Sequence, residues 1–312
     1  MDSVQIRRMR VGALRRFAAA ISILTILGHL VLGFEAPIAY VVVALITAYC
    51  FELSMETIDA WSTNRSAGYR GSIIRLLDFL LPAHITALAI AMLLYSNERL
   101  WPVAFAVIVA LGSKHIFRIT TSIGKRKHFL NPSNTGIVVV LLLFPWVGIS
   151  PPYQYTENVS GSLNWILPLL FIVAGTFLNA KFTKKIPLIS AWLMGFFLQA
   201  VVRSWLYGTP VAAALNPMTG VAFLLFTFYM ISDPGTTPFK WKAQVLFGFS
   251  VAFVYGLLMA WHVVFGLFFA LLPVCVIRGV YIFWEESSLS AKLNTQQIGH
   301  SEPKISPTYS RG

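Results

Sequence analysis

The sequence is poor in charged residues, and poorest in acidic ones. Only 12% of its 312 residues are charged, and 24 Lys and Arg residues outnumber 12 Asp and Glu residues. Soluble domains carry about 25% charged residues, so this scarcity excludes an ordinary water-soluble globule. The only two cysteines, Cys50 and Cys275, lie in apolar runs with no CxxC spacing and no neighbouring His. They therefore indicate neither a disulfide framework nor a zinc site.

Long apolar runs make up most of the chain. Hydrophobic residues account for 57% of it, and runs of about 17–23 residues, each long enough to cross a bilayer as a helix, recur along most of its length. We therefore predict an all-α polytopic membrane protein of the plasma (inner) membrane, with about ten transmembrane helices in a domain covering 17–283. The predicted spans are 17–34, 36–53, 73–95, 101–117, 133–150, 163–180, 187–207, 211–231, 243–260 and 262–283.

The basic residues indicate how these spans are oriented. If the basic N-terminal segment 1–16 is cytoplasmic, 19 of the 24 Lys and Arg residues fall in cytoplasmic segments, four fall within spans, and only Arg99 falls outside. Cytoplasmic loops of membrane proteins carry such an excess, so both termini are predicted to be cytoplasmic. The positive charges lie in short loops and form no stripe for a phosphate backbone, so nucleic acid is not an expected partner.

The last segment, 284–312, differs from the rest in composition. It is rich in Ser, Pro and Gln and has few large apolar residues. Such a segment cannot bury enough surface to fold alone, so a disordered cytoplasmic tail is predicted. The apolar runs leave no room for a soluble catalytic domain, and the function is expected in or at the membrane.

Two apolar segments begin with the same residues, Asn-Pro followed shortly by Thr-Gly. Asn131 and Pro132 open "NPSNTGIVVVLLLFP", and Asn216 and Pro217 open "NPMTGVAFLLF". Asn caps the free amide groups of a helix start, and Pro at the first position loses no hydrogen bond. A helix that starts at membrane depth can present its amide hydrogens to an anion or an electron-rich ring edge; ordinary capping is the alternative. The candidate cofactor-binding residues of the two motifs are Asn131, Pro132, Asn134, Thr135, Asn216, Pro217 and Thr219.

In the predicted topology the two motifs enter the membrane from opposite sides. Opposed helix starts that converge on one site are typical of inverted-repeat membrane folds. The motifs lie in the fifth and eighth predicted spans, whereas a repeat of five plus five helices would pair the third with the eighth. The two motifs therefore need not be symmetry mates.

Charged side chains near the predicted inner face add further candidates. Asp233, in the turn "SDPG", could serve a proton, a ring nitrogen of a cofactor, or the amides of its own turn. Lys114, His115 and Arg118 lie within about one helical turn of each other. This arrangement suits either positive-inside anchoring or the anionic edge of a cofactor.

Within the spans, a few ionisable residues stand out. Arg75 and Asp78 are three residues apart and are predicted to pair, because charges inside a membrane rarely stay alone. His29 and His262 lie towards the predicted outer face, and His84 lies near mid-membrane. Two facing histidines could ligate a b-type haem, although nothing in the spacing demands it.

These motifs resemble those of the RnfD/NqrB family, membrane subunits of ion-coupled electron-transport complexes. "FLNPSNTGIVVVLLLFP" is similar to the family's Asn-Pro helix start, "KKIPLISAWLMGFF" to its following span, and "NPMTGVAFLLFTFYMISDPGTTP" to its eighth span and the turn after it. "SKHIFR", "NPSNTG" and "ISDPGTTP" are similar to the RnfD-like, UnbU-type branch found in enediyne biosynthesis clusters. The resemblance covers about residues 101–260.

The resemblance implies a ten-helix bundle with inverted repeats, reminiscent of urea transporters, and a flavin. In the family an FMN is joined to a threonine of an external segment of the "GATPL" type. This chain departs there, because its external loop "ISPPYQYTENVSGS" is short and its only threonine, Thr156, stands in the unlike context "QYTEN". The expected cofactor is therefore a non-covalent flavin, FMN or riboflavin. The expected partners are the lipid bilayer and other membrane or redox subunits.

Three functions are compatible with the sequence. The first is an RnfD-like membrane component of electron transfer that holds a flavin among the capped helix starts, in a pathway of the enediyne type, with Asp233 tuning the flavin or closing an inner gate. The second is a permease or channel for a small solute, which uses the same inverted-repeat fold without redox chemistry. The third is a haem-binding subunit or a scaffold for a pathway enzyme.

The predicted orientation can be tested by thiol labelling. A cysteine introduced at Ser160 should react with a membrane-impermeant thiol reagent in intact cells, because that loop is predicted to be external. A cysteine introduced at Ser287 should not react. The reverse labelling pattern would refute the predicted topology.

Overall fold

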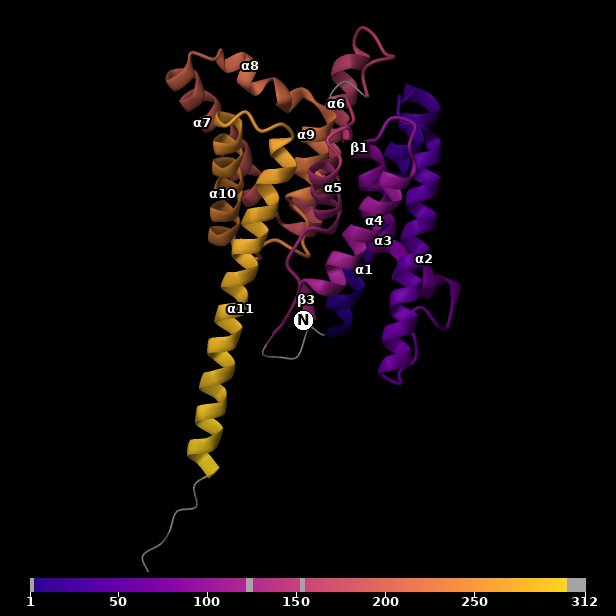
Figure 1. Ribbon diagram of the computed structural model, residues 1–312, viewed down its shortest axis with the longest axis vertical. Helices are drawn as coiled ribbons and strands as arrows, with labels where there is room; N and C mark the ends of the chain where they lie inside the picture. Colours follow the sequence, from indigo (N-terminus) through magenta and orange to yellow (C-terminus); the bar gives the residue numbers. More distant parts are fainter. Residues whose placement is uncertain (1–2, 122–125, 152–154, 302–312) are drawn as a thin grey trace, which may run out of the picture.

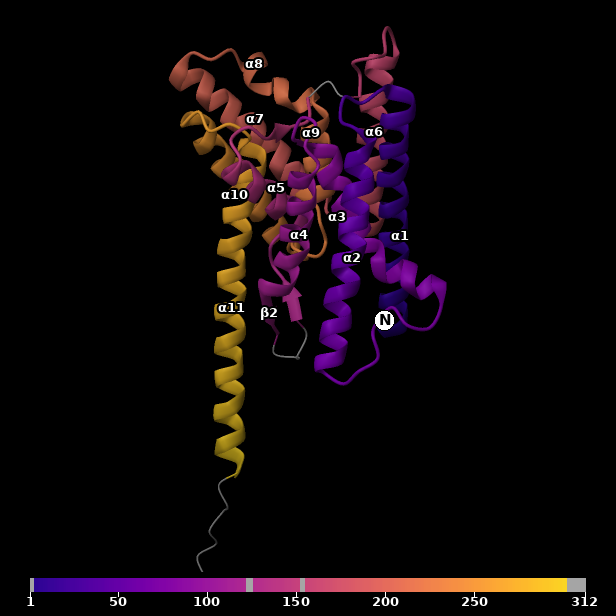
Figure 2. The same ribbon diagram turned by 45° about the vertical axis from the view of Figure 1, so that its right-hand side comes forward.

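The computed structural model describes residues 3–121, 126–151 and 155–301 of the chain. Nearly all of its regular structure is helical, and the long helices run side by side along one axis (Figures 1 and 2). The strands are short and form two antiparallel pairs at loops. β1 (Leu94–Tyr95) pairs with β4 (Gly148–Ile149), and β2 (Arg118–Thr120) pairs with β3 (Arg126–His128). The second pair marks the lower end of the bundle in Figure 1, here called the basic end; α8 lies at the other, the outer end.

In the described part of the chain, seven apolar helical segments are long enough to cross a bilayer, which confirms a multi-pass, all-α membrane protein. The first comprises most of α1 and the π turn η1, and the fourth joins α6 to the π turn η2. Their helices are α1 (Ser3–Leu27), η1 (Gly28–Leu32), α2 (Ile38–Ser62), α3 (Ile73–Leu93), α6 (Leu163–Leu178), η2 (Asn179–Thr183), α7 (Ile186–Tyr207), α10 (Trp241–Ala260) and α11 (Gly266–Ser301).

The prediction of ten spans is not confirmed, because three of the predicted spans take a different form. Two are shorter apolar helices, α4 (Trp101–Ile116) and α5 (Pro132–Leu143). A helix of 12 residues such as α5 is about 18 Å long, well short of the roughly 30 Å hydrocarbon core. It ends early because Phe144 precedes Pro145, and a residue before proline disfavours the helical conformation.

The third exception is a bent pair that counts as an eighth span only if its two halves are taken together. The helical segments Val211–Thr219 and Ala222–Met230 meet at an angle of 71°. The bend lies at the break after Thr219, where Gly220 has an extended backbone directly after a 3₁₀ turn. The elements involved are α8 (Val211–Leu215), the 3₁₀ helix η3 (Asn216–Thr219), α9 (Val221–Leu225) and the π turn η4 (Phe226–Met230).

Two buried asparagines hold the π turn η4 in the middle of the fold. A π turn breaks the regular pattern of backbone hydrogen bonds within a helix. The Asn131 side-chain amide, from the start of α5, donates to the carbonyl of Met230 at 3.0 Å. The Asn179 side-chain amide, from the end of α6, donates to the carbonyl of Phe228, also at 3.0 Å. α5 and α6 are therefore joined to the same turn by hydrogen bonds that the bilayer cannot replace.

The core is one continuous apolar cluster that links the two ends of the sequence. Phe226 of η4 and Phe268 of α11 are fully buried, and their rings meet edge to face at 6.1 Å. Small residues bring the central helices close together: a Cβ on Gly136 of α5 would lie 2.3 Å from the Ala106 carbonyl of α4. α4 and α5 consequently pack backbone to backbone, so their shortness is compensated by burial.

Tryptophan marks the edges of the apolar region. Of nine Trp residues, only Trp192 is among the fully buried side chains. Seven of the other eight lie at or near helix ends, with Trp165 and Trp205 each 83% exposed, and Trp284 lies near the end of the apolar segment Gly266–Ser288 of α11. Exposed Trp at helix ends is the pattern of a membrane–water interface. The large apolar side chains exposed between these ends therefore face lipid.

Both ends of the described chain differ in detail from the sequence prediction. α1 begins at Ser3, so most of the basic segment 1–16 is helical. α11 continues to Ser301, whereas a disordered tail was predicted from residue 284. The Ala, Leu, Glu and Gln residues of 284–301 favour helix and extend a helix that is already nucleated. Residues 302–312 lie outside the described part of the chain. Figure 1 shows the start of α1 and the described end of α11 at the same end of the bundle.

Candidate functional site

The first Asn-Pro motif caps a helix, as predicted. The side-chain oxygen of Asn131 accepts a hydrogen bond from the backbone N–H of Asn134 at 3.0 Å, and Pro132 occupies the first turn of α5. The Asn134 amide group donates to the carbonyl of Phe268 at 3.0 Å, and the Thr135 hydroxyl donates to the carbonyl of Asn131. Asn131, Asn134 and Thr135 are all buried. Protein groups thus bind the side-chain amide donors at this helix start, while the buried side-chain oxygen of Asn134 has no hydrogen-bond partner.

The second motif does not cap a helix, contrary to the prediction. Asn216 and Pro217 lie in the 3₁₀ turn η3, where Asn216 is exposed and makes no capping hydrogen bond. The Thr219 hydroxyl donates to the carbonyl of Asn216 at 2.8 Å and is also exposed. The helix α8 already runs into Asn216, so the residue does not begin a helix from an extended segment. Ten residues, 220–229, separate Thr219 from Met230, whose carbonyl accepts the hydrogen bond from the Asn131 side chain. The two motifs therefore do not converge on one site.

Asp233 binds its own turn, which was one of the three predicted roles. Its carboxylate accepts from the backbone N–H of Gly235 at 3.1 Å and from the Thr236 hydroxyl at 2.8 Å. Two basic side chains bind the same turn. Arg278 donates to the carbonyl of Thr236, and the fully buried Lys185 donates to the carbonyl of Pro238. Burial lowers the pKa of Lys185 to about 8, with Asp233 raising it and Arg278 lowering it further.

The positive charges predicted at the end of α4, on Lys114, His115 and Arg118, are partly neutralised by an acidic side chain. Lys114 pairs with Glu52 of α2, with its Nζ 3.2 Å from both carboxylate oxygens, and both side chains are largely buried. Arg118 donates to the Nδ1 of His115 at 2.8 Å. Lys114 therefore joins two helices and does not face an anionic cofactor. This geometry fits anchoring better than cofactor binding.

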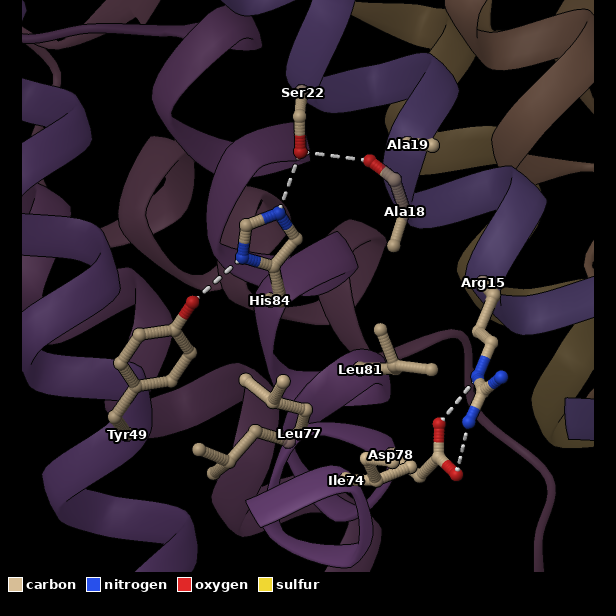
Figure 3. Close-up of a pocket in the computed structure, with 11 residues that line it drawn as sticks. Arg15, Ala18, Ala19, Ser22, Tyr49, Ile74, Leu77, Asp78, Leu81 and His84 are labelled. Carbon is tan, nitrogen blue, oxygen red and sulfur yellow. Dashed lines mark hydrogen bonds and ion pairs between the residues drawn. The ribbon is translucent and has the colours of Figure 1, made fainter.

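An opening between α1, α2 and α3, which the sequence did not reveal, is the better candidate site (Figure 3). Its volume is about 540 Å³. Ile74, Leu77 and Leu81 of α3 form an apolar wall. The polar lining residues fall into two groups, Ser22 with Tyr49 and His84, and Arg15 with Asp78.

The first polar group is a chain of hydrogen bonds across three helices. The Tyr49 hydroxyl lies 2.6 Å from Nδ1 of His84, and the Ser22 hydroxyl lies 2.7 Å from Nε2. Ser22 donates its own proton to the carbonyl of Ala18 at 2.7 Å. The Ser22 oxygen must therefore accept from Nε2–H of His84, which leaves Nδ1 to accept from Tyr49. This order makes His84 a neutral imidazole whose two nitrogens are both engaged.

The second polar group is an ion pair at one side of the cavity. Arg15 of α1 binds the carboxylate of Asp78 through two hydrogen bonds, of 2.7 and 2.8 Å. The predicted pair between Arg75 and Asp78 is therefore wrong. Arg75, in the first turn of α3, donates to the carbonyl of Gly68 in the preceding loop. Asp78 points instead towards α1, whose Arg15 offers two donors to one carboxylate.

Comparisons with known proteins give no family. No protein-family model matches the chain, and no curated protein matches it. Among the described residues, no three His, Cys, Asp or Glu side chains are grouped as a metal site would require. The site must therefore be interpreted from its own residues.

The unequal roles of the two Asn-Pro motifs can be tested by a matched pair of substitutions. Asn131→Ala removes a cap, which typically costs about 1 kcal/mol. It also removes a buried hydrogen bond to the Met230 carbonyl, which keeps only the Asp233 N–H at 3.2 Å; losing such a bond costs about 0.5–1.5 kcal/mol more. The variant should unfold at a lower temperature than the wild type in detergent. Asn216→Ala, which removes an exposed side chain without a capping bond, should unfold like the wild type. Equal destabilisation by the two substitutions would contradict the assignment.

Proposed function

We propose that this protein is an RnfD-like integral membrane component of electron transfer, and that its redox-active ring binds non-covalently in the cavity between α1, α2 and α3. The observation that supports this most is the Tyr49–His84–Ser22 hydrogen-bond chain on the cavity wall. Ionisable side chains inside a membrane are costly and mark functional sites by default. A hydrogen-bonded imidazole is also the side chain best suited to move a proton near neutral pH.

The resemblance in sequence implies a flavin, and the two candidate places differ in how well they suit one. The start of α5 fits less well, because the backbone N–H groups of Asn134 and Thr135 are bound by Asn131, and the side-chain amides of Asn131 and Asn134 are bound by the carbonyls of Met230 and Phe268. The cavity does fit: its apolar wall can contact the faces of a planar ring, and the exposed guanidinium of Arg15 stands near a polar or anionic tail. A bound flavin would supply the electron-carrying chemistry. The chain would supply the apolar enclosure and hold a proton at His84.

The organisation of the helices supports the family assignment. α1 and α6 both end in a π turn followed by a left-handed residue, Gly33 and Lys184 respectively. In both cases the next backbone N–H, of Phe34 or Lys185, returns to the first residue of the π turn at 3.1 Å. α2 packs on α4 in one half, and α7 packs on α10 in the other. We read these matching features as two inverted halves that begin at α1 and α6.

A small-solute permease is the second candidate, and the same two-half organisation favours it. A pore of that fold would be expected where the halves meet. Phe268, whose carbonyl accepts from Asn134 of the first half, and Phe226, whose ring packs against it, are each 0% exposed. These large side chains fill the interface, so electron transfer is preferred to transport.

The proposal includes the orientation and the setting. The basic end would face the cytoplasm, since 19 of 24 Lys and Arg residues are assigned to that side. The plasma membrane would then carry both termini on its inner face. Other membrane or redox subunits would provide and receive the electrons, in a natural-product pathway of the enediyne type if the closer sequence resemblance holds.

The absorption spectrum of the purified protein tests this function. We expect the blue absorption band of an oxidised flavin, bleached by dithionite, and no fluorescent band after denaturing electrophoresis, because binding is non-covalent. Ser22→Ala should lower the flavin content, since it removes the contact with His84.

The matched control is Ser250→Ala. Ser250 also donates to the carbonyl four residues earlier, at 2.8 Å, but lies on α10 and does not line the cavity, so the flavin content should not change. A colourless protein that carries a small solute into liposomes would favour the permease. A Soret band would favour the haem protein.

A further inference from the structure

The α1–α3 interface carries a line of polar residues on one face of α1. Arg15, Ser22, Thr25 and His29 fall within a narrow arc at 3.6 residues per turn. The first three contact α3 through Asp78, His84 and Met92 in turn. The line thus runs from the basic end of the bundle towards the outer end. It could conduct protons only if each member can donate and accept one.

The line is interrupted on the outer side of His84. The Thr25 hydroxyl lies 3.1 Å from the sulfur of Met92, and it also donates to the carbonyl of Ile21 at 2.8 Å. Thr25, Ile21 and Met92 are at most 4% exposed. A thioether has no proton to pass on and is only a weak acceptor. This contact therefore seals the cavity from His29 and the outer end.

The line is open on the other side of His84. The Arg15 and Asp78 side chains are 54% and 26% exposed at the cavity mouth. Ile74 and Leu77, which line the cavity within about one turn before Asp78 on α3, are each 58% exposed. Figure 3 shows Leu81 between the ion pair and the His84 chain. The opening therefore faces the basic end.

We propose that His84 is a one-sided proton-exchange site, which takes up protons only from the basic end of the bundle, past Arg15 and Asp78. The proposal rests on the proposed function for the use of the proton, but its geometry is independent of any cofactor. The groups that face His84 are Ser22 on α1 and Tyr49 on α2. On the neighbouring α2 and α4, Glu52 and Lys114 are already paired with each other.

The transfer balances within these residues. A proton from the basic end adds to Nδ1 of His84, and Tyr49 turns its hydroxyl so that its oxygen accepts from the new N–H. Nε2–H continues to donate to Ser22. When Nδ1 gives this proton up to the cavity, the imidazole returns to its neutral form and Tyr49 again donates to Nδ1. Asp78 is a positioning residue here, since it holds Arg15 at the mouth.

Cysteine accessibility in sealed vesicles tests the sidedness. The exposed Cys50 is first replaced by Ser, and the buried Cys275 is kept. Leu81→Cys, on the cavity wall, should react with an impermeant methanethiosulfonate reagent in inside-out vesicles and lose that reaction in right-side-out vesicles. Met92→Cys, at the seal, should react in neither.

Labelling of Leu81→Cys from the outer side, or from neither side, would overturn the proposal. A second readout follows the proton itself. Diethyl pyrocarbonate, which crosses membranes, modifies neutral imidazole, and its reaction with His84 can be followed by mass spectrometry. The rate should fall when the pH at the basic end is lowered from about 8 to about 6, the range in which His titrates. It should not respond to the pH at the outer end.

A rate that follows the outer pH, or neither pH, would again refute one-sided exchange. Both experiments are independent of the spectrum. A colourless protein with the expected labelling would refute the flavin and leave the proton site standing. A flavin-containing protein that is labelled from the outer side would refute the one-sided proton site and leave the flavin proposal standing.

Discussion

The fold depends on the side-chain hydrogen bonds that attach α5 and α6 to the π turn η4. Within a bilayer no water can satisfy a backbone carbonyl, so each unpaired one costs several kcal/mol. The carbonyls of Met230 and Phe228 accept from the Asp233 N–H and the Ser232 hydroxyl, and the amides of Asn131 and Asn179 give each a further donor from another helix. Because these asparagines belong to α5 and α6, one short turn determines where both helices lie. Asn134 extends the same connection to α11 through the carbonyl of Phe268.

This central connection explains why the candidate site lies elsewhere. Around η4 the polar groups bind one another and large aromatic side chains fill the remaining space, so a ligand would have to displace protein. α1 and α2 belong to the rim of the bundle, and many of their apolar residues face lipid, as Ile23 and Ile46 do. Rim helices can separate without exposing the core. The cavity, with His84 on its wall, forms where such a separation costs least.

The sequence was sufficient to predict the seven long membrane helices, and it was insufficient to predict the short and bent ones or the site. Apolar runs of bilayer length identify spans whatever their neighbours are, so the long helices were found. Asn131 and Asn216 show the limit of local motifs, since the same dipeptide caps a buried helix once and lies in an exposed 3₁₀ turn the second time. The difference arises from the packing around each motif and not from its own residues.

Contacts between residues that are far apart in the chain could not be predicted from the sequence, for the same reason. Asp78 pairs with a residue 63 positions earlier in place of one three positions earlier. His84 was noted only for its depth, because its partners Ser22 and Tyr49 lie 62 and 35 residues away. A polar residue on each of three helices becomes a site only when the helices are assembled. Helical periodicity could have found one part of it, the polar stripe along α1.

The most direct test of this account is an experimental structure of the protein in a lipid nanodisc, prepared without added cofactor. We predict extra density between α1, α2 and α3, in contact with Tyr49 and His84, and protein alone around the start of α5. Density seated on the backbone amides near Asn131, with the α1–α3 cavity closed by side chains, would contradict the account.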